Sequence, residues 1–179
     1  MCIRDRDIGK AILYRNENKG TLEGFKEATK ISNDELLKLE VDVLIPAALE
    51  NAITEKNVNS IKAKVIVEGA NGPTSHEADS IIEKNGIIAV PDILANAGGV
   101  IVSYFEWVQN RLGFKWTKSR VYRRSDSIIK QSFNNVYSIS KKYKVSLRTA
   151  AYIAAIDKVS RTYKYRDGSF TFQKNGQNT

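Results

Sequence analysis

The chain has 179 residues and a formal net charge of +8, and its 42% hydrophobic and 27% charged residues are typical of a soluble globular protein. It has no apolar run long enough to span a bilayer, and its polar start does not resemble a signal peptide, so we expect neither a membrane protein nor a secreted one. Cys2 is the only cysteine, which excludes a disulfide framework and a cysteine-based metal site and makes the reducing cytoplasm the expected compartment.

The charge is distributed unevenly along the chain. Residues 1–110 hold 12 Lys and Arg against 17 Asp and Glu, whereas residues 111–179 hold 16 against 3. A basic C-terminal third is typical of nucleic-acid binding, but it also fits a solvated helical surface. We favour the solvated surface, because the basic residues do not alternate with exposed aromatic residues in a recognisable nucleic-acid-binding pattern.

Residues 1–6 and 167–179 differ from the rest of the chain. The first segment has no hydrophobic periodicity and carries the only methionine and the only cysteine, so we expect a non-native or mistranslated end. The last segment is polar, and we expect it to fray. The fold therefore concerns residues 7–166, which open with two short helices that Asp7 and Ser32 would cap.

The middle of the chain alternates between two kinds of pattern. Three short runs rich in Val and Ile, each bounded by turn residues, predict buried strands at 41–45, 64–67 and 87–90. Helical patterns lie between these runs, at about 54–62 and 75–85. Strands that alternate with helices form right-handed crossovers and a parallel sheet, so the predicted fold class is α/β.

From residue 93 onward the pattern is helical only. Helices are predicted at 93–111, with an interruption at its glycine pair, at 118–144, and after a cap at Ser146. The 118–144 segment has one apolar stripe, as expected of a helix with a single packed face. The last helix is apolar on several sides, which predicts that it is buried.

Each predicted strand runs directly into an unusual segment, at 46–51, 68–73 and 91–100. In an open parallel sheet the ligand crevice lies beyond the carboxyl ends of the strands. The three segments are therefore expected to meet at one edge of the sheet and to form a binding site there.

The side chains of these segments suit a flat, partly apolar ligand with amide groups. Ala47 and Ala48 are small enough to let a ring approach the backbone, although tight packing between strand and helix would explain them equally well. Asn71 offers a donor and an acceptor, but asparagine is also common at turns. Asn96 could pair with a carboxamide.

On one helix, Asn96, Gly99, Val100 and Ser103 would share a face at spacings of three and four residues. An amide, a bare backbone and a hydroxyl on one face of an otherwise apolar helix are unusual for a core. Gly99 would let a ligand approach closely, and Ser103 could donate to a carboxylate. Alternatively, Gly99 serves helix contact and Ser103 bonds to a carbonyl one turn earlier.

The sequence offers no catalytic constellation and no cluster of metal ligands. His76 is the only histidine, and we expect it to be exposed. The glycine fingerprint G-x-G-x-x-G of dinucleotide-binding proteins does not occur. We therefore expect binding residues in this chain, and neither a catalytic residue nor a metal ligand.

Four segments, correctly ordered and spaced, closely resemble the glutamate dehydrogenase family, within the wider glutamate, leucine, phenylalanine and valine dehydrogenase superfamily. They are VDVLIPAALENAIT (41–54), KVIVEGANGPT (64–74), VPDILANAGGVIVSYFEWVQN (90–110) and SLRTAAYIAAIDKV (146–159). The resemblance implies that residues 7–166 are a partial dinucleotide-binding domain, with a partial Rossmann-like parallel sheet of about three strands followed by long C-terminal helices. It also implies that the substrate domain is absent.

The resemblance assigns a role to each candidate residue. The cofactor, NAD or NADP, would be bound at the three strand ends by Ala47, Ala48, Asn71 and Asn96. The substrate would face Val100 and Ser103, with Ser103 on its side-chain carboxylate. The family's catalytic residues lie in the substrate domain, so none is expected here.

The implied reaction is the reversible oxidative deamination of L-glutamate to 2-oxoglutarate and ammonia, in a protein that usually forms hexamers. A leucine- or phenylalanine-type dehydrogenase is an alternative, but its apolar substrate would leave Ser103 without a partner. A basic nucleic-acid-binding module is a second alternative, which explains the charge but none of the strand-end segments. We expect neither nucleic acid nor a membrane among the partners.

We predict that the 179-residue chain does not turn over glutamate, because the resemblance assigns it no catalytic group and only part of the cofactor site. We also expect it to be poorly stable, since an exposed strand edge and exposed apolar surface promote aggregation. Purified chain supplied with glutamate and either dinucleotide should yield no reduced cofactor in an absorbance assay. Measurable reduction would contradict the prediction.

Overall fold

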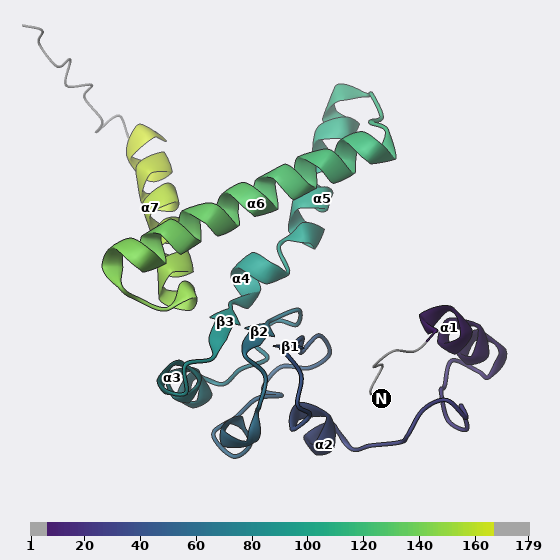
Figure 1. Cartoon of the computed structure of the whole chain (residues 1–179). Coiled ribbons are helices and arrows are strands. Elements are labelled where there is room, and N and C mark those ends of the chain that lie inside the picture. The colour runs from purple at the N-terminus through teal and green to yellow at the C-terminus, as the bar shows by residue number, and fades with distance from the viewer. Residues whose placement is uncertain (1–6, 167–179) are drawn as a thin grey trace, which may run out of the picture.

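The structure, a computed structural model, describes residues 7–166, so the predictions for 1–6 and 167–179 lie outside the described residues. A three-stranded parallel sheet forms in the order β1-β2-β3. The strands are β1 (Val43–Leu44), β2 (Val65–Val67) and β3 (Ile88–Val90). Each strand falls inside its predicted run, which confirms the α/β class and the partial Rossmann-like parallel sheet followed by long C-terminal helices (Figure 1).

One segment between the strands is less regular than predicted. The pattern at 54–62 predicts a helix, but the structure has only a 3₁₀ turn, η1, at Val58–Ser60. The Asn57 side chain accepts a hydrogen bond from the Thr54 backbone N–H and donates one to the Ala52 carbonyl, both at 2.9 Å. Such local side-chain bonds compete with the hydrogen bonds of a helix, which explains why the helix does not form.

The sheet packs on α3 (His76–Lys84), the helix predicted at 75–85, whose first turn is capped by the Ser75 side chain. The core between them is aliphatic and buried, and consists of Ile53, Val58, Ile61, Ala63, Ile66, Ala78 and Ile82. The prediction of three buried strands holds only in the centre: Val43 and Ile88 of the outer strands are about half exposed (48% and 54%). A parallel sheet buries a strand only where both faces are covered, and in the described residues the outer strands are not.

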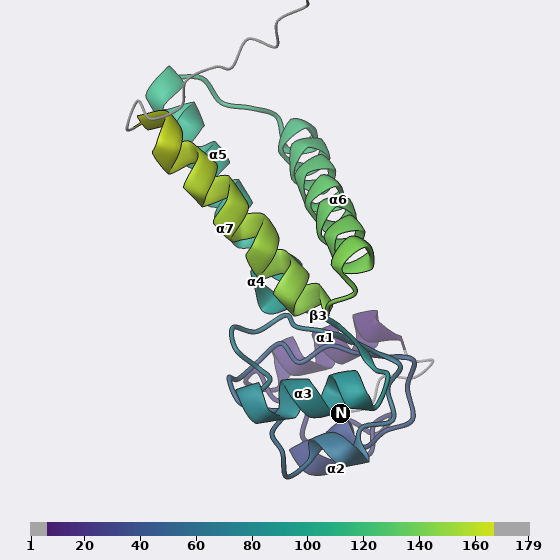
Figure 2. The same ribbon diagram turned by 90° about the vertical axis from the view of Figure 1, so that its left-hand side faces the viewer.

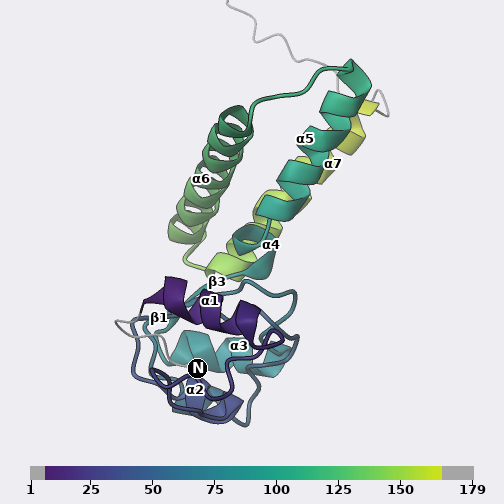
Figure 3. The ribbon, with the colours of Figure 1, turned by 90° about the vertical axis from the view of Figure 1, so that its right-hand side faces the viewer.

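The C-terminal part of the chain is a helical arm that rises from the sheet (Figures 2 and 3). Its helices are α4 (Asp92–Ala95), α5 (Gly98–Leu112), α6 (Lys118–Tyr143) and α7 (Leu147–Arg166). In Figure 1, α6 runs diagonally between α5 and α7, and it contacts α4, α5 and α7. No helix of the described residues is both long and apolar enough to cross a membrane.

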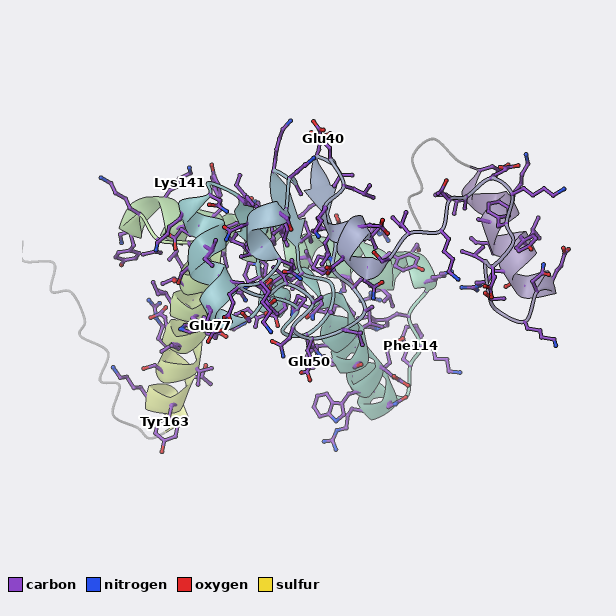
Figure 4. The ribbon with its side chains drawn as sticks, turned by 90° about the horizontal axis from the view of Figure 1, so that it is seen from below. Glu40, Glu50, Glu77, Phe114, Lys141 and Tyr163 are labelled. Atoms are coloured by element: carbon purple, nitrogen blue, oxygen red, sulfur yellow. The ribbon has the colours of Figure 1, made fainter. Side chains whose placement is uncertain are left out.

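The prediction that the last helix is buried is wrong for most of its length. Ala150 and Ala151, near the start of α7, are buried in a second core with Leu94 and Val136. Farther along, Ile156 is 66% exposed, because α7 leaves the sheet and extends away from it (Figure 2). Seen from below, the labelled Tyr163 marks the far end of α7 (Figure 4).

Two short helices precede the sheet, α1 (Ile8–Glu17) and α2 (Asn33–Leu37). Both are capped as predicted, since the Asp7 carboxylate accepts the Lys10 N–H and the Ser32 hydroxyl accepts the N–H three residues later. In Figure 1 an extended segment leads from α1 to α2, and α1 lies apart from the sheet. The strand-end segments thus follow α1 and α2 in the chain, and α3 and the start of α7 contact β3.

The position of the core can be tested on two isoleucines of neighbouring strands. Ile66 in β2 is fully buried, whereas Ile88 in β3 is 54% exposed. Ile66→Ala should lower the free energy of unfolding by about 2–5 kcal/mol, because it removes buried methylene groups and leaves a cavity. The matched control Ile88→Ala should cost less than about 1 kcal/mol. Urea unfolding measures both, and equal losses would place the core elsewhere.

Candidate functional site

The segments that follow the three strands meet at the carboxyl edge of the sheet. The backbone N–H groups of Gly69 and Ala70 both donate to the Pro46 carbonyl, at 3.0 and 2.9 Å, which joins the segment after β2 to the segment after β1. The Asn51 N–H donates to the Gly72 carbonyl at 2.9 Å and continues this junction. The sheet thus brings together residues that the chain separates by whole helices and turns.

Two asparagines from different strand ends form the centre of the site. The Nδ2 of Asn96 donates to the Oδ1 of Asn71 at 2.7 Å and to the Ala70 carbonyl at 3.4 Å. The Nδ2 of Asn71 and the Oδ1 of Asn96 bond to no other described residue, so the pair keeps one donor and one acceptor for a ligand. A primary carboxamide carries one acceptor oxygen and one donor nitrogen, and it is complementary to this pair.

Ala47 and Ala48 lie at the end of β1, where both are exposed. A Cβ added at Gly69 would lie only 3.1 Å from the Cβ of Ala47, so the two strand ends are in close contact there. The packing interpretation therefore has support at Ala47, because any side chain at Gly69 would press against it. Ala48 is free to face a ligand.

The structure divides the predicted helical face into two parts. Asn96 caps the end of α4 and α5 begins at Gly98, so Asn96 is not on the same helix as Ser103. Gly99, Val100 and Ser103 lie on α5 and are exposed, Val100 by 76%. The Ser103 hydroxyl bonds to no described residue, and the interpretation that it bonds to a carbonyl of its own helix therefore has no support.

Next to the amide pair lies an ion-pair cluster that the sequence analysis missed. Glu68, at the end of β2, is fully buried; its Oε1 accepts from Nη2 of Arg148 at 2.5 Å, and its Oε2 accepts from the Asp92 N–H at 2.9 Å. Arg148 also donates from Nε to Asp79 at 2.9 Å, and its Nη1 lies 3.6 Å from the Asp92 carboxylate. Burial disfavours the charge of Arg148, but the hydrogen bonds and charges of Glu68 and Asp79 outweigh burial and raise the pKa of Arg148 above its ordinary value.

A sequence signal for this cluster exists, although it does not identify the pairing. Glu68 directly follows an apolar strand, and Arg148 lies near the start of a predicted helix that is apolar on several sides. A charged residue within an apolar run is rarely buried unless it is paired. Which acid pairs with which base depends on the packing of α7 against the sheet, which local patterns do not reveal.

No group of three or more His, Cys, Asp and Glu side chains within residues 7–166 could hold a metal ion. His76 is the first residue of α3 and is exposed, as predicted. The polar groups of the site are amides, backbone and a hydroxyl. Such a set binds and orients a ligand, and it does not by itself transfer a proton near neutral pH.

Basic side chains lie over aromatic rings at the start of α6. The guanidinium groups of Arg120 and Arg124 lie over the Trp116 ring, 4.9 and 4.5 Å from its centroid, and the Lys118 ammonium lies 5.5 Å from the Tyr122 centroid. These contacts lie next to the loop between α5 and α6, which carries the labelled Phe114 in Figure 4.

A parallel sheet with unpaired polar groups at its carboxyl edge places the chain in the class of Rossmann-like α/β proteins. The chain belongs to the Glutamate/Leucine/Phenylalanine/Valine dehydrogenase family, whose sequence model matches residues 4–167. The family resemblance inferred from the four sequence segments is thereby confirmed.

Several relatives carry the name glutamate dehydrogenase. The chain is 51% identical to glutamate dehydrogenase of Thermotoga maritima over 160 residues, which are 89% of this chain and 38% of that protein. It is 45% identical to NAD-specific glutamate dehydrogenase of Clostridioides difficile over 158 residues, 88% of this chain and 38% of that protein. The chain thus spans little more than a third of the length of these relatives.

Solved structures show the same arrangement of elements. The glutamate dehydrogenase of Peptoniphilus asaccharolyticus matches with a TM-score of 0.74 and 35% identity, over 90% of this chain and 35% of that one. The hetero-hexameric glutamate dehydrogenase of Thermus thermophilus, in a Leu-bound form, matches with a TM-score of 0.83 and 26% identity, over 92% of this chain and 38% of that one.

Proposed function

We propose that this chain is the nicotinamide-binding part of an NAD-dependent glutamate dehydrogenase, which catalyses the reversible oxidative deamination of L-glutamate to 2-oxoglutarate and ammonia. The observation that carries the proposal is the hydrogen-bonded pair of Asn71 and Asn96, whose remaining donor and acceptor match a primary carboxamide. Nicotinamide carries such a group, and the bound dinucleotide would supply the hydride acceptor of the reaction.

The share of this chain in the reaction is to orient the cofactor and the substrate. Asn71 and Asn96 would fix the carboxamide, and with it the face of the ring that receives the hydride, while Ala47 and Ala48 would leave room along the path of the cofactor. We propose NAD rather than NADP as the cofactor, since several relatives, that of Clostridioides difficile among them, are named NAD-specific. Residues 7–166 would then be part of a dinucleotide-binding domain together with its C-terminal helices.

The substrate would lie against the exposed face of α5 that carries Val100 and Ser103. A free hydroxyl on an apolar helix favours a substrate whose side chain ends in a carboxylate, because that group accepts a charge-assisted hydrogen bond. A leucine- or phenylalanine-type dehydrogenase would place an apolar side chain there and leave the Ser103 hydroxyl unpaired in a closed site, which is costly. Ser103 therefore favours glutamate.

For the assembly and the compartment, the sequence arguments remain the basis of the proposal. We propose an oligomer, a homo-hexamer by resemblance, and note that the Thermus thermophilus protein of similar fold is a hetero-hexamer. The cytoplasm is the proposed compartment, on the ground of the single cysteine.

Nucleic-acid binding is a second candidate function, favoured only by the basic and aromatic turn around Trp116. It would involve none of the strand-end residues. The two candidates separate on a heparin column: salt-sensitive retention without any response to dinucleotide would favour nucleic acid, whereas binding of dinucleotide would favour the dehydrogenase.

The carboxamide site can be tested with two ligands that differ only in the nicotinamide. Asn96→Ala should weaken NAD binding roughly tenfold, because a hydrogen bond to the carboxamide and the bond that orients Asn71 are both lost. Binding of ADP-ribose, which lacks nicotinamide, should not change. The control Asn110→Ala alters an exposed asparagine of α5 and should affect neither ligand. Calorimetric titration measures all of these, and equal losses for NAD and ADP-ribose would exclude Asn96 as a nicotinamide contact.

The substrate side chain is tested at Ser103. In the enzyme, Ser103→Ala should lower kcat/KM for glutamate by roughly one to two decades, since a hydrogen bond to a charged group is worth about 1.5–3 kcal/mol. It should spare norvaline, whose side chain is apolar, and leave cofactor affinity nearly unchanged. Steady-state kinetics on both amino acids decides the question. An unchanged ratio between the two substrates would remove Ser103 from the substrate site.

A further inference from the structure

The ion-pair cluster joins the helical arm to the sheet at one arginine. Arg148 lies in the first turn of α7, and its three nitrogens face three carboxylates from three different elements. Glu68 extends from the end of β2, and its second oxygen accepts the backbone N–H of Asp92 at the start of α4. The guanidinium thus fixes a strand end and a helix start relative to each other.

The same cluster reaches the amide pair through the backbone. The Oδ2 of Asp92 accepts the N–H of Gly72 at 2.9 Å, and Gly72 directly follows Asn71. Gly72 has a positive φ of 54°, so the loop turns at this point and depends on the bond for its course. Asp92 also begins the single turn of α4 that ends at Asn96, so both members of the pair stand on segments that Asp92 and Glu68 hold.

We propose that Arg148 is a positioning residue for the carboxamide site, acting through Glu68 and Asp92 on Asn71 and Asn96. The identity of the ligand rests on the proposed function of that site, whereas the positioning by Arg148 rests on the hydrogen bonds alone. Arg148 touches neither asparagine. It sets the 2.7 Å contact between them, and with it the spacing of the donor and acceptor offered to the carboxamide.

An arginine is required at this place for two physical reasons. One cation faces three carboxylates, and Glu68 is fully buried, so removal of the cation would leave a buried charge uncompensated. The planar guanidinium group also directs Nε, Nη1 and Nη2 in separate directions, and each nitrogen faces a different carboxylate. Lysine keeps the charge but offers one compact group, which cannot hold three carboxylates in this arrangement.

Asp79 provides a control within the cluster. Its carboxylate binds Nε of Arg148 at 2.9 Å from α3, and no hydrogen bond links it to the strand-end loops. Loss of Asp79 should therefore affect stability without displacing the asparagines. A purely structural cluster would respond alike to changes at Asp79 and at Asp92, whereas a positioning cluster would not.

The experiment compares Arg148→Lys with Arg161→Lys in the full 179-residue chain. Arg161 lies on the same helix, and its Nε bonds to Asp157 at 3.0 Å on the exposed surface. Two readouts are used: the side-chain amide NMR signals of Asn71 and Asn96 in the ligand-free protein, and the affinity for NAD by titration. Melting temperatures are recorded for every variant, so that a general loss of stability is recognised.

Arg148→Lys should shift both asparagine amide signals and weaken NAD binding roughly tenfold, since it breaks charge-assisted bonds that hold the site. Arg161→Lys should change neither readout, and Asp79→Asn should lower the melting temperature but leave the amide signals in place. Unchanged amide signals and unchanged NAD affinity in Arg148→Lys would overturn the proposal.

Two further outcomes are also decisive. If Arg148→Lys does not fold, Asp92→Asn replaces it. That variant keeps a side-chain oxygen for the Gly72 N–H but loses the negative charge that faces Arg148. Unchanged amide signals and unchanged NAD affinity in Asp92→Asn would refute the proposal. If the unaltered chain, to which the family resemblance assigns only part of the cofactor site, does not bind NAD, the affinity readout is dropped. The ligand-free amide signals then still decide whether Arg148 positions the asparagines.

Discussion

A carboxylate that is fully buried must be compensated by charge and hydrogen bonds, and Glu68 imposes this requirement at the end of the central strand. Arg148 of α7, which lies 80 residues after Glu68 in the chain, supplies that compensation. The consequence is a fixed attachment of α7 to the sheet, at the edge where the strand-end segments meet. The ion pairs of the cluster hold the arm at this edge, and the second core around Ala150 packs beside them.

The site depends on this attachment because it is built from segments that are short and irregular. The loop after β2 and the single turn of α4 have few hydrogen bonds of their own, and Asp92 supplies the bonds that join them. Asn71 and Asn96 can then form a pair with a defined polarity, one donor and one acceptor. A flexible pair of amides would bind a carboxamide in either orientation, whereas a fixed pair selects one. Under the proposed function, this selection would set which face of the nicotinamide ring meets the substrate.

Sequence patterns predicted most of the elements, and their failures have local causes. The strands were predicted correctly because short β-branched runs bounded by turn residues are typical of buried strands. The helix α6 was predicted correctly because its apolar stripe has a clear helical period. At 54–62 the structure has a 3₁₀ turn instead of the predicted helix, and the Asn57 side chain bonds locally to the Thr54 N–H and the Ala52 carbonyl, in competition with helical bonding. Burial of α7 was predicted from its apolar sides. An apolar surface can be buried, but whether it is buried depends on a neighbouring element, and the described residues cover only the start of α7.

The sequence by itself determined the α/β class, the three strands and the long C-terminal helices, together with the family resemblance that the comparisons confirmed. Only the tertiary structure decided that Asn71 and Asn96 are partners, that Asn96 is separated from the face of α5, and that Arg148 binds Glu68, Asp79 and Asp92. The physical reason is that strands and helices follow from interactions within a few residues, which leave a periodic trace in the sequence. Contacts across 25 or 80 residues depend on the order of the strands and on how the arm packs, and no local pattern records them.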